Sequence, residues 1–126
     1  MMTTRMFAER CCRRDLGEIK DNNNSSIIFV EPIDGDCLHL EAAITGPVST
    51  PYENGILFID LKLPEEFPFS PPQSIIFKHD IMHPNVNEIN EFRSEISKQE
   101  FWSPTMTIRS ILEHVWARLA IPGGDS

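Results

Sequence analysis

The spacing of hydrophobic residues changes along this chain from a helical period to an alternating one and then back to a helical one. Near the beginning, Ala8, Cys12, Leu16 and Ile19 recur at intervals of three and four residues. This spacing predicts a helix, which we expect to end before the polar run 21–26. The Asp, Asn and Ser side chains of that run are typical of a loop because they compete for backbone hydrogen bonds.

Three runs of strand-forming residues follow the predicted helix. They cover residues 27–31, 38–44 and 57–63, and in the second and third runs apolar residues alternate with polar ones. Turn-forming residues at 32–36 and 46–55 separate the runs. Connections this short favour an antiparallel meander over a parallel sheet, which would need long crossovers.

A proline-rich segment at 64–72 ends this alternation, and its prolines exclude both a helix and a central strand. Residues 74–77 predict a fourth short strand. From 78 to 104 no period is strong. An irregular segment of this length in a small domain is usually functional or mobile.

The helical period returns near the end of the chain. The apolar residues of this stretch are Ile108, Ile111, Leu112, Val115 and Leu119, with Trp116 extending their face. Thr107 is a suitable N-cap, and Gly123 and Gly124 follow the expected end. The pattern therefore predicts a single α+β domain over residues 1–126, with a first helix, a four-stranded meander, a long irregular segment and a second helix.

Charge narrows the possible partners. The formal net charge of -8 argues against binding to nucleic acid or to an anionic membrane surface. Residues 1–20 nevertheless hold five Lys or Arg against three acids. This basic segment on an acidic body indicates either a polar docking surface or a solvated helix face.

The cysteine pattern and the histidines suggest neither disulfides nor a metal. Cys11 and Cys12 are adjacent and no CxxC occurs, so a reducing cytoplasmic or nuclear setting is expected. No secretory signal is evident before residue 10, and no run is apolar enough for a membrane span. His79 and His83 lack a third ligand, so we expect no metal and no cofactor.

Four local motifs occur in the order and near the spacing found in ubiquitin-conjugating enzymes. They are Thr50-Pro51-Tyr52-Glu53-Asn54-Gly55, the segment Leu63–Pro72, His83-Pro84-Asn85, and Phe101-Trp102-Ser103-Pro104 with Thr107-Ile108. These resemble the TPYEGG turn, the LPxxYPFxPP segment, the HPN motif and the WSPALTI segment of that family. The resemblance spans about residues 5–120 and implies the family's α+β fold.

The family's chemistry uses a cysteine thiolate that carries the modifier as a thioester. By the family's spacing, the position eight residues after Asn85 is Arg93, and the position eight before Trp102 is Ser94. Neither is Cys, and no Cys follows Cys37. The resemblance therefore implies no catalytic residue, and Asn85, which steadies an oxyanion in the family, is expected to have a structural role.

Two substitute nucleophiles are conceivable. Ser94 would need a neighbouring base, and no spacing in the sequence pairs a histidine with it. Cys37 is expected to lie far from the HPN motif. We therefore expect an inactive protein, with an active conjugating enzyme that uses Ser94 as the alternative.

By length the chain resembles the ubiquitin-conjugating enzyme variants, which lack the catalytic Cys and the family's C-terminal helices. The resemblance implies a non-catalytic adaptor or regulator that binds ubiquitin or a ubiquitin-like protein, a ligase, or an active conjugating enzyme, possibly as a heterodimer. The residues expected to bind the partner are Arg5, Arg10, Arg14, Phe69, Ser103 and Pro104. A decayed product without a role is the third interpretation.

Overall fold

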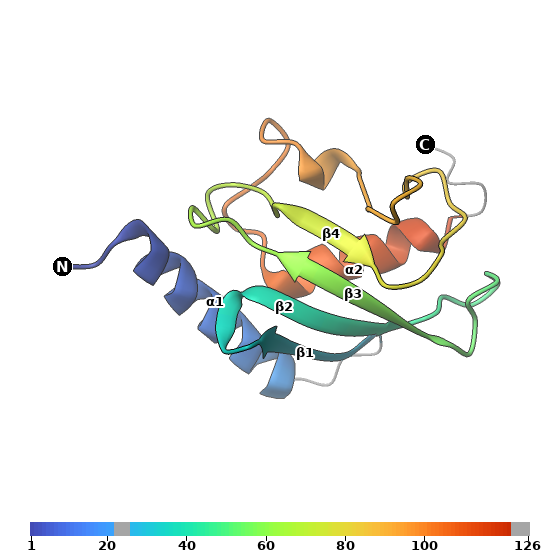
Figure 1. Cartoon of the computed structure of the whole chain (residues 1–126), viewed down its shortest axis with the longest axis horizontal. Coiled ribbons are helices and arrows are strands. Elements are labelled where there is room, and N and C mark those ends of the chain that lie inside the picture. Colours follow the sequence, from blue (N-terminus) through green and yellow to red (C-terminus); the bar gives the residue numbers. More distant parts are fainter. Residues whose placement is uncertain (22–25, 122–126) are drawn as a thin grey trace.

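The computed structural model describes residues 1–21 and 26–121 (Figure 1). Its elements in chain order are α1 (Thr4–Asp21), β1 (Ile27–Ile33), β2 (Asp36–Thr45), β3 (Ile56–Lys62), β4 (Ser74–Phe77), the 3-10 turn η1 (Glu95–Ser97) and α2 (Ile108–Leu119). The four strands form one antiparallel sheet in the order β1-β2-β3-β4. The predicted α+β architecture and meander are confirmed.

The first hairpin is tighter than the sequence pattern indicated. Pro32 pairs with Leu40, so β1 continues through residues that were expected to form a turn. Proline is tolerated there because β1 is an edge strand, where one backbone N–H is not needed by a neighbour. The turn itself is confined to Asp34 and Gly35, whose φ angles of 52° and 75° suit a tight hairpin.

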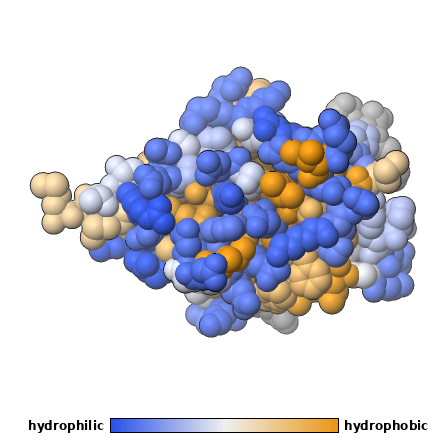
Figure 2. All heavy atoms as spheres, viewed as in Figure 1, coloured by the Kyte–Doolittle hydropathy of each residue, from blue (hydrophilic) through white to orange (hydrophobic). Residues whose placement is uncertain are grey.

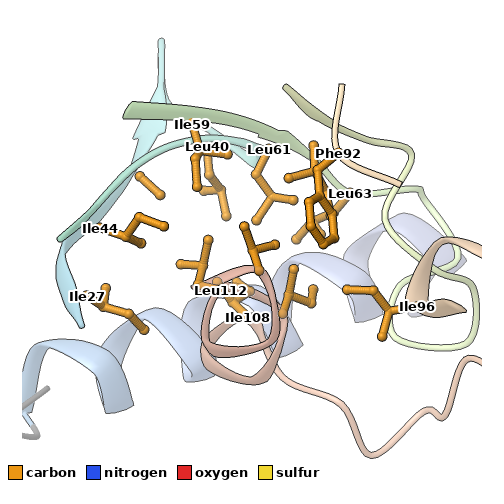
Figure 3. Packing of buried hydrophobic residues seen from close by; sticks show 14 of the residues in the cluster. Ile27, Leu40, Ile44, Ile59, Leu61, Leu63, Phe92, Ile96, Ile108 and Leu112 are labelled. Atoms are coloured by element: carbon orange, nitrogen blue, oxygen red, sulfur yellow. The ribbon is translucent and has the colours of Figure 1, made fainter. Parts of the chain in front are cut away.

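The core lies between one face of the sheet and α2 (Figure 3). Leu40, Ile59 and Leu61 point from the sheet toward Ile108 and Leu112 of α2, and all five are fully buried. The alternating pattern in the strands and the helical stripe in the last helix are therefore both confirmed. Burying each large apolar side chain stabilises the fold by roughly 1.5–3 kcal/mol before entropy is counted.

Helix α1 packs against β1, β2 and α2. Its predicted stripe is confirmed at Ala8, Cys12 and Ile19, but Cys11 and Asp15 are also buried. The helix includes Asp21, one residue beyond the expected end. The rest of the polar run, residues 22–25, and the glycines predicted to follow α2 lie outside the described residues.

The segment between β4 and α2 has little regular structure, as the sequence predicted. One isolated bridge, Val86 with Phe92, folds the segment back on itself, and a second, Ile76 with Glu91, ties it to β4 before η1 follows. Phe92 and Trp102 are buried and anchor the segment to the core. Thr107 caps α2 by accepting a hydrogen bond from the Ser110 backbone N–H, as expected. Of the helices in the described residues, none is long and apolar enough to cross a membrane.

Candidate functional site

The loop that contains His83, Pro84 and Asn85 is held from inside and outside. Within it, the Asn85 backbone N–H donates to His83 Nδ1 at 3.1 Å, and the Val86 N–H donates to the His83 carbonyl at 2.9 Å. From outside, the Tyr52 hydroxyl accepts a hydrogen bond from the Met82 N–H at 2.9 Å. Two of the motifs found in the sequence therefore meet in space and fix the loop together.

Asn85 joins this loop to the segment where a catalytic residue was sought. Its Nδ2 donates to the Arg93 carbonyl at 3.0 Å, and its own carbonyl accepts from the Arg93 N–H at 2.8 Å. Asn85 Oδ1 is buried and has no hydrogen-bond partner in the described residues. The side chain therefore connects the loop around His83 to the segment around Arg93.

Ser94 follows directly, and both its side chain and its backbone make polar contacts. Its Oγ accepts from the Ile96 N–H at 3.4 Å, which caps η1, and its own N–H donates to Ser97 Oγ at 3.3 Å. Ser94 Oγ also lies 2.9 Å from Nε2 of His114 in α2. The expectation that no histidine pairs with Ser94 is wrong, because the fold brings together two residues that no local spacing connects.

The surroundings of His114 favour its neutral form. Burial lowers the pKa of His114, the nearby Glu95 carboxylate opposes this, and Arg118 adds to it. Glu95 and Arg118 form an ion pair with each other, so most of their effect on the imidazole cancels. The backbone N–H of Glu95 and the Arg118 guanidinium lower the pKa of the Glu95 carboxyl. The ring of Phe92 meets the imidazole edge-on, with centroids 6.1 Å apart.

No cysteine approaches this site in the described residues. Cys11, Cys12 and Cys37 are free and buried where α1 packs against β2, and β3 and β4 separate them from the loop after β4 (Figure 1). Cys12 Sγ donates to the Cys37 carbonyl, and burial raises the pKa of the Cys12 thiol. The Cys12 thiol is therefore protonated and a poor nucleophile, and all three cysteines lie apart from the loop that contains Asn85.

Metal binding at the histidines finds no support either. His79 Nε2 accepts a hydrogen bond from the Phe58 backbone N–H at 3.0 Å, so its lone pair is already used. Among residues 1–21 and 26–121, no three His, Cys, Asp or Glu side chains are grouped in a way that would hold a metal ion.

The residues expected to bind a partner come from three segments that lie together. The Trp102 indole Nε1 donates to the Pro68 carbonyl at 2.6 Å, and Gln99 Nε2 donates to the Phe69 carbonyl at 3.2 Å. The Phe69 ring is 56% exposed and stacks on Phe7 of α1 with centroids 5.8 Å apart. The start of α1, the proline-rich segment and the segment around Trp102 therefore form one continuous surface.

We refer to this region as the docking surface. It comprises Phe7, Arg10, Phe69, Ser103 and Pro104. Hydrophobic side chains reach the surface among hydrophilic ones at the N-terminal end of the chain, on the left of Figure 2. Phe7 was missed by the sequence analysis, although it is 37% exposed and contacts Phe69. Its exposure is significant only because the proline-rich segment, which is distant in sequence, places Phe69 against it.

The three arginines predicted to bind a partner are not equivalent. Arg5 forms ion pairs with Glu9, Asp36 and Glu65 at 3.0–3.2 Å, so its charge is neutralised within the chain. Arg14 Nη2 lies 3.3 Å from Asp15 Oδ1. Arg10 is exposed and pairs with no acid in the described part of the chain. Of the three, Arg10 is the cation best placed to attract an acidic partner.

Comparison with known proteins identifies the family and the fold. Residues 12–126 match the family model described as ubiquitin-conjugating enzyme. The chain belongs to the ubiquitin-conjugating enzyme family. Among solved structures it is similar to human ubiquitin-conjugating enzyme E2 G1, with a TM-score of 0.84 and 30% sequence identity. That match covers 97% of this chain and 100% of the other.

Membership in the family indicates the process to which this site belongs. A conjugating-enzyme domain indicates a role in ubiquitin conjugation, and interaction with ubiquitin and ligases is a general property of such a fold. In this member the HPN loop is present and well braced, but the position beside it holds Arg93 and Ser94 in place of a thiol.

Proposed function

We propose that this protein acts in ubiquitin or ubiquitin-like protein conjugation mainly by docking, as a conjugating-enzyme-like adaptor or regulator without a cysteine thioester of its own. Its partner is a ligase, an active conjugating enzyme, or the modifier itself, and a heterodimer with an active enzyme is one form of such a complex. The exposed Phe69 ring stacked on Phe7 is the observation that carries the proposal.

The geometry of this pair suits a binding surface. An aromatic residue that is exposed over half its area contributes less to the core than a buried one, whereas aromatic side chains at the centre of an interface often dominate binding energy. Trp102 and Gln99 fix the backbone beneath Phe69 through hydrogen bonds to the Pro68 and Phe69 carbonyls. The ring is therefore held in position before a partner arrives, which reduces the entropy cost of binding.

Arg10 supplies the charge for this surface. It lies on the same helix as Phe7, close to one turn further along, and it has no acidic partner in the described residues. An unpaired cation on the rim of an interface raises the association rate with an acidic partner and favours that partner over a basic one. The basic excess in residues 1–20 then has a function that a solvated helix face would not require.

Binding measurements test the proposal directly. Purified protein would be titrated against ubiquitin, a ligase and an active conjugating enzyme, each separately. We expect Phe69→Ala to weaken binding about tenfold or more, which is a loss of about 1.4 kcal/mol. Arg10→Glu should slow association more at low salt than at high salt.

The matched control is Val48→Ala, which truncates a side chain that is 69% exposed in the loop between β2 and β3, outside the docking surface. It should bind as the wild type does. Unchanged affinity of the Phe69→Ala and Arg10→Glu variants for every partner that binds the wild type would show that the docking surface is assigned wrongly.

A further inference from the structure

The contact between Ser94 and His114 has the geometry of a nucleophile and its base. Ser94 Oγ and His114 Nε2 are 2.9 Å apart, within the range in which a hydroxyl proton passes to an imidazole. Ser94 Oγ already accepts a hydrogen bond from the Ile96 N–H. The hydroxyl proton is therefore free to point toward Nε2, as it must before transfer.

The state of the imidazole is also suitable. A base must be unprotonated at Nε2, and burial lowers the pKa of His114 and so favours the neutral ring. The charged groups nearest the ring are Glu95 on η1 and Arg118 on α2, and they neutralise each other in an ion pair. Because Glu95 and Arg118 neutralise each other, neither strongly stabilises the protonated imidazole or strongly repels an approaching electrophile.

The pair differs from a full triad in one respect. In a triad a carboxylate accepts from Nδ1 and orients the imidazole. In the described residues no hydrogen bond reaches His114 Nδ1, and the edge contact of the buried Phe92 ring orients the imidazole instead. Without the carboxylate the imidazolium formed after proton transfer is less stabilised. Acyl transfer should therefore be slow, which suits an acceptor more than an enzyme of many turnovers.

The family to which the chain belongs indicates the class of electrophile that would reach Ser94. Ser94 is half-buried beside Arg93, which is exposed and is fastened to Asn85 of the HPN loop. A chain of this family works among protein modifiers whose C-terminal carboxyl is activated as a thioester. We propose that Ser94 and His114 together accept an acyl group from such a C-terminal thioester and form an oxyester on Ser94. The choice of donor rests on the proposed function, whereas the reactivity of the pair does not.

The step balances without any further reagent. Ser94 Oγ forms a bond to the thioester carbonyl carbon while its proton moves to His114 Nε2. The tetrahedral intermediate collapses with cleavage of the C–S bond, and the departing sulfur takes the proton from His114. The products are the oxyester and a free thiol. Because an alkoxide leaves less readily than a thiolate, amines displace the ester slowly, and the acylated protein accumulates.

A small thioester tests the reactivity without any docking. Full-length protein would be incubated with phenyl thioacetate, and acetylation would be followed by intact mass and peptide mapping. We expect a single acetyl group on Ser94 that resists thiols and is removed by alkali. His114→Gln should slow the reaction about a hundredfold, in line with the loss of a general base. The rate should rise with pH through the lowered pKa of His114 and then level off.

Matched variants separate chemistry from folding. Ser97→Ala removes the other half of the η1 capping box but leaves Ser94 and His114 in place, so it should react at the wild-type rate. Ser94→Ala should not be acetylated, and thermal melts would show whether it remains folded. Ser94→Cys keeps a nucleophile at the same place and should give a thiol-labile adduct.

Several results would overturn the inference. They are no acetylation of Ser94, acetylation of cysteines alone, an undiminished rate in His114→Gln, or no adduct in a folded Ser94→Cys variant.

A second experiment tests the donor. Incubation of the protein with activating enzyme, ATP and ubiquitin should give a thiol-resistant, alkali-labile conjugate. Reaction with the small thioester but not with charged activating enzyme would refute a protein modifier as the donor. Failure of the docking proposal appears separately, as unchanged binding of Phe69→Ala.

Discussion

The Asp15 carboxylate in α1 accepts a hydrogen bond at 3.1 Å from the backbone N–H of Ile108, the first residue of α2. Asp15 is only 2% exposed, and Ile108 is fully buried. The N–H groups in the first turn of a helix have no partner within the helix, so a buried one needs an acceptor from elsewhere. Asp15 supplies it, and in doing so it ties α1 to the start of α2.

We predict that Asp15→Ala destabilises the protein by about 1–3 kcal/mol, because it leaves a buried N–H without an acceptor. Asp15→Asn keeps an oxygen within reach of that N–H and should cost much less. Urea unfolding of both variants measures the difference. Equal losses for the two variants would show that loss of the acceptor oxygen is not what destabilises Asp15→Ala, because Asp15→Asn retains one.

The same carboxyl should make stability depend on pH. Burial raises the pKa of Asp15, and the hydrogen bonds from Ile108 and Arg14 oppose the shift without cancelling it. Its stabilising contribution is therefore complete below its ordinary pKa of 3.8 and is lost as the pH rises through the raised folded-state pKa. We expect the stability of Asp15→Asn relative to the wild type to increase with pH across that interval. A pH-independent difference would contradict the shift.

His114 should give a pH dependence of the opposite sign. Its folded-state pKa lies below the ordinary 6.5 because burial disfavours the imidazolium, while Glu95 and Arg118 act in opposite directions. The unfolded chain therefore binds the proton first, and stability present above pH 6.5 is lost as the pH falls through the folded-state pKa. His114→Gln should lose less stability than the wild type over this interval in matched urea titrations. Parallel curves for the two proteins would contradict the prediction.

Gly46 is required by close packing within the loop between β2 and β3. A Cβ atom at this position would lie 1.6 Å from the Tyr52 carbonyl oxygen, which is backbone and has no rotamer to move away. We predict that Gly46→Ala destabilises the protein by about 3 kcal/mol or more, at the upper end of overpacking effects. Thermal or urea unfolding provides the measurement.

Gly17→Ala is the matched control for Gly46→Ala. Gly17 lies inside α1, and nothing lies within 4 Å of the position its Cβ would take. Alanine is favoured over glycine in a helix interior, so this variant should gain roughly 0.5–1 kcal/mol. Similar effects of the two substitutions would show that the close approach at Tyr52 does not exist in solution.

The hydrogen bond from the Met82 N–H to the Tyr52 hydroxyl should control opening of the HPN loop. In Tyr52→Phe this bond is lost while the ring remains, which should cost at most about 0.5–1.5 kcal/mol of global stability. The local effect should be larger, with faster hydrogen exchange at the Met82 amide. If exchange at Met82 is the same in both proteins, Tyr52 does not brace the loop.

Local pattern was sufficient to predict most of the fold. Alternation from Leu57 to Leu63 identified β3 and its buried face, and the stripe from Ile108 to Leu119 identified α2 with its N-cap at Thr107. These elements follow from periods of two and 3.6 residues, which depend only on neighbours in sequence. The boundaries of β1 were less accurate because the pattern cannot show that Pro32 lies on an edge strand.

By itself the sequence determined the family resemblance, the absence of a cysteine beside the HPN motif, and the segments from which a docking surface would be built. Only the tertiary structure decided that His114 lies beside Ser94, that Arg5 is neutralised by three acids, and that Asp15 caps α2. These contacts join residues from distant parts of the chain, and no period or motif encodes them. They exist because burying the sheet against α1 and α2 brings those positions together, which is a property of the packed core as a whole.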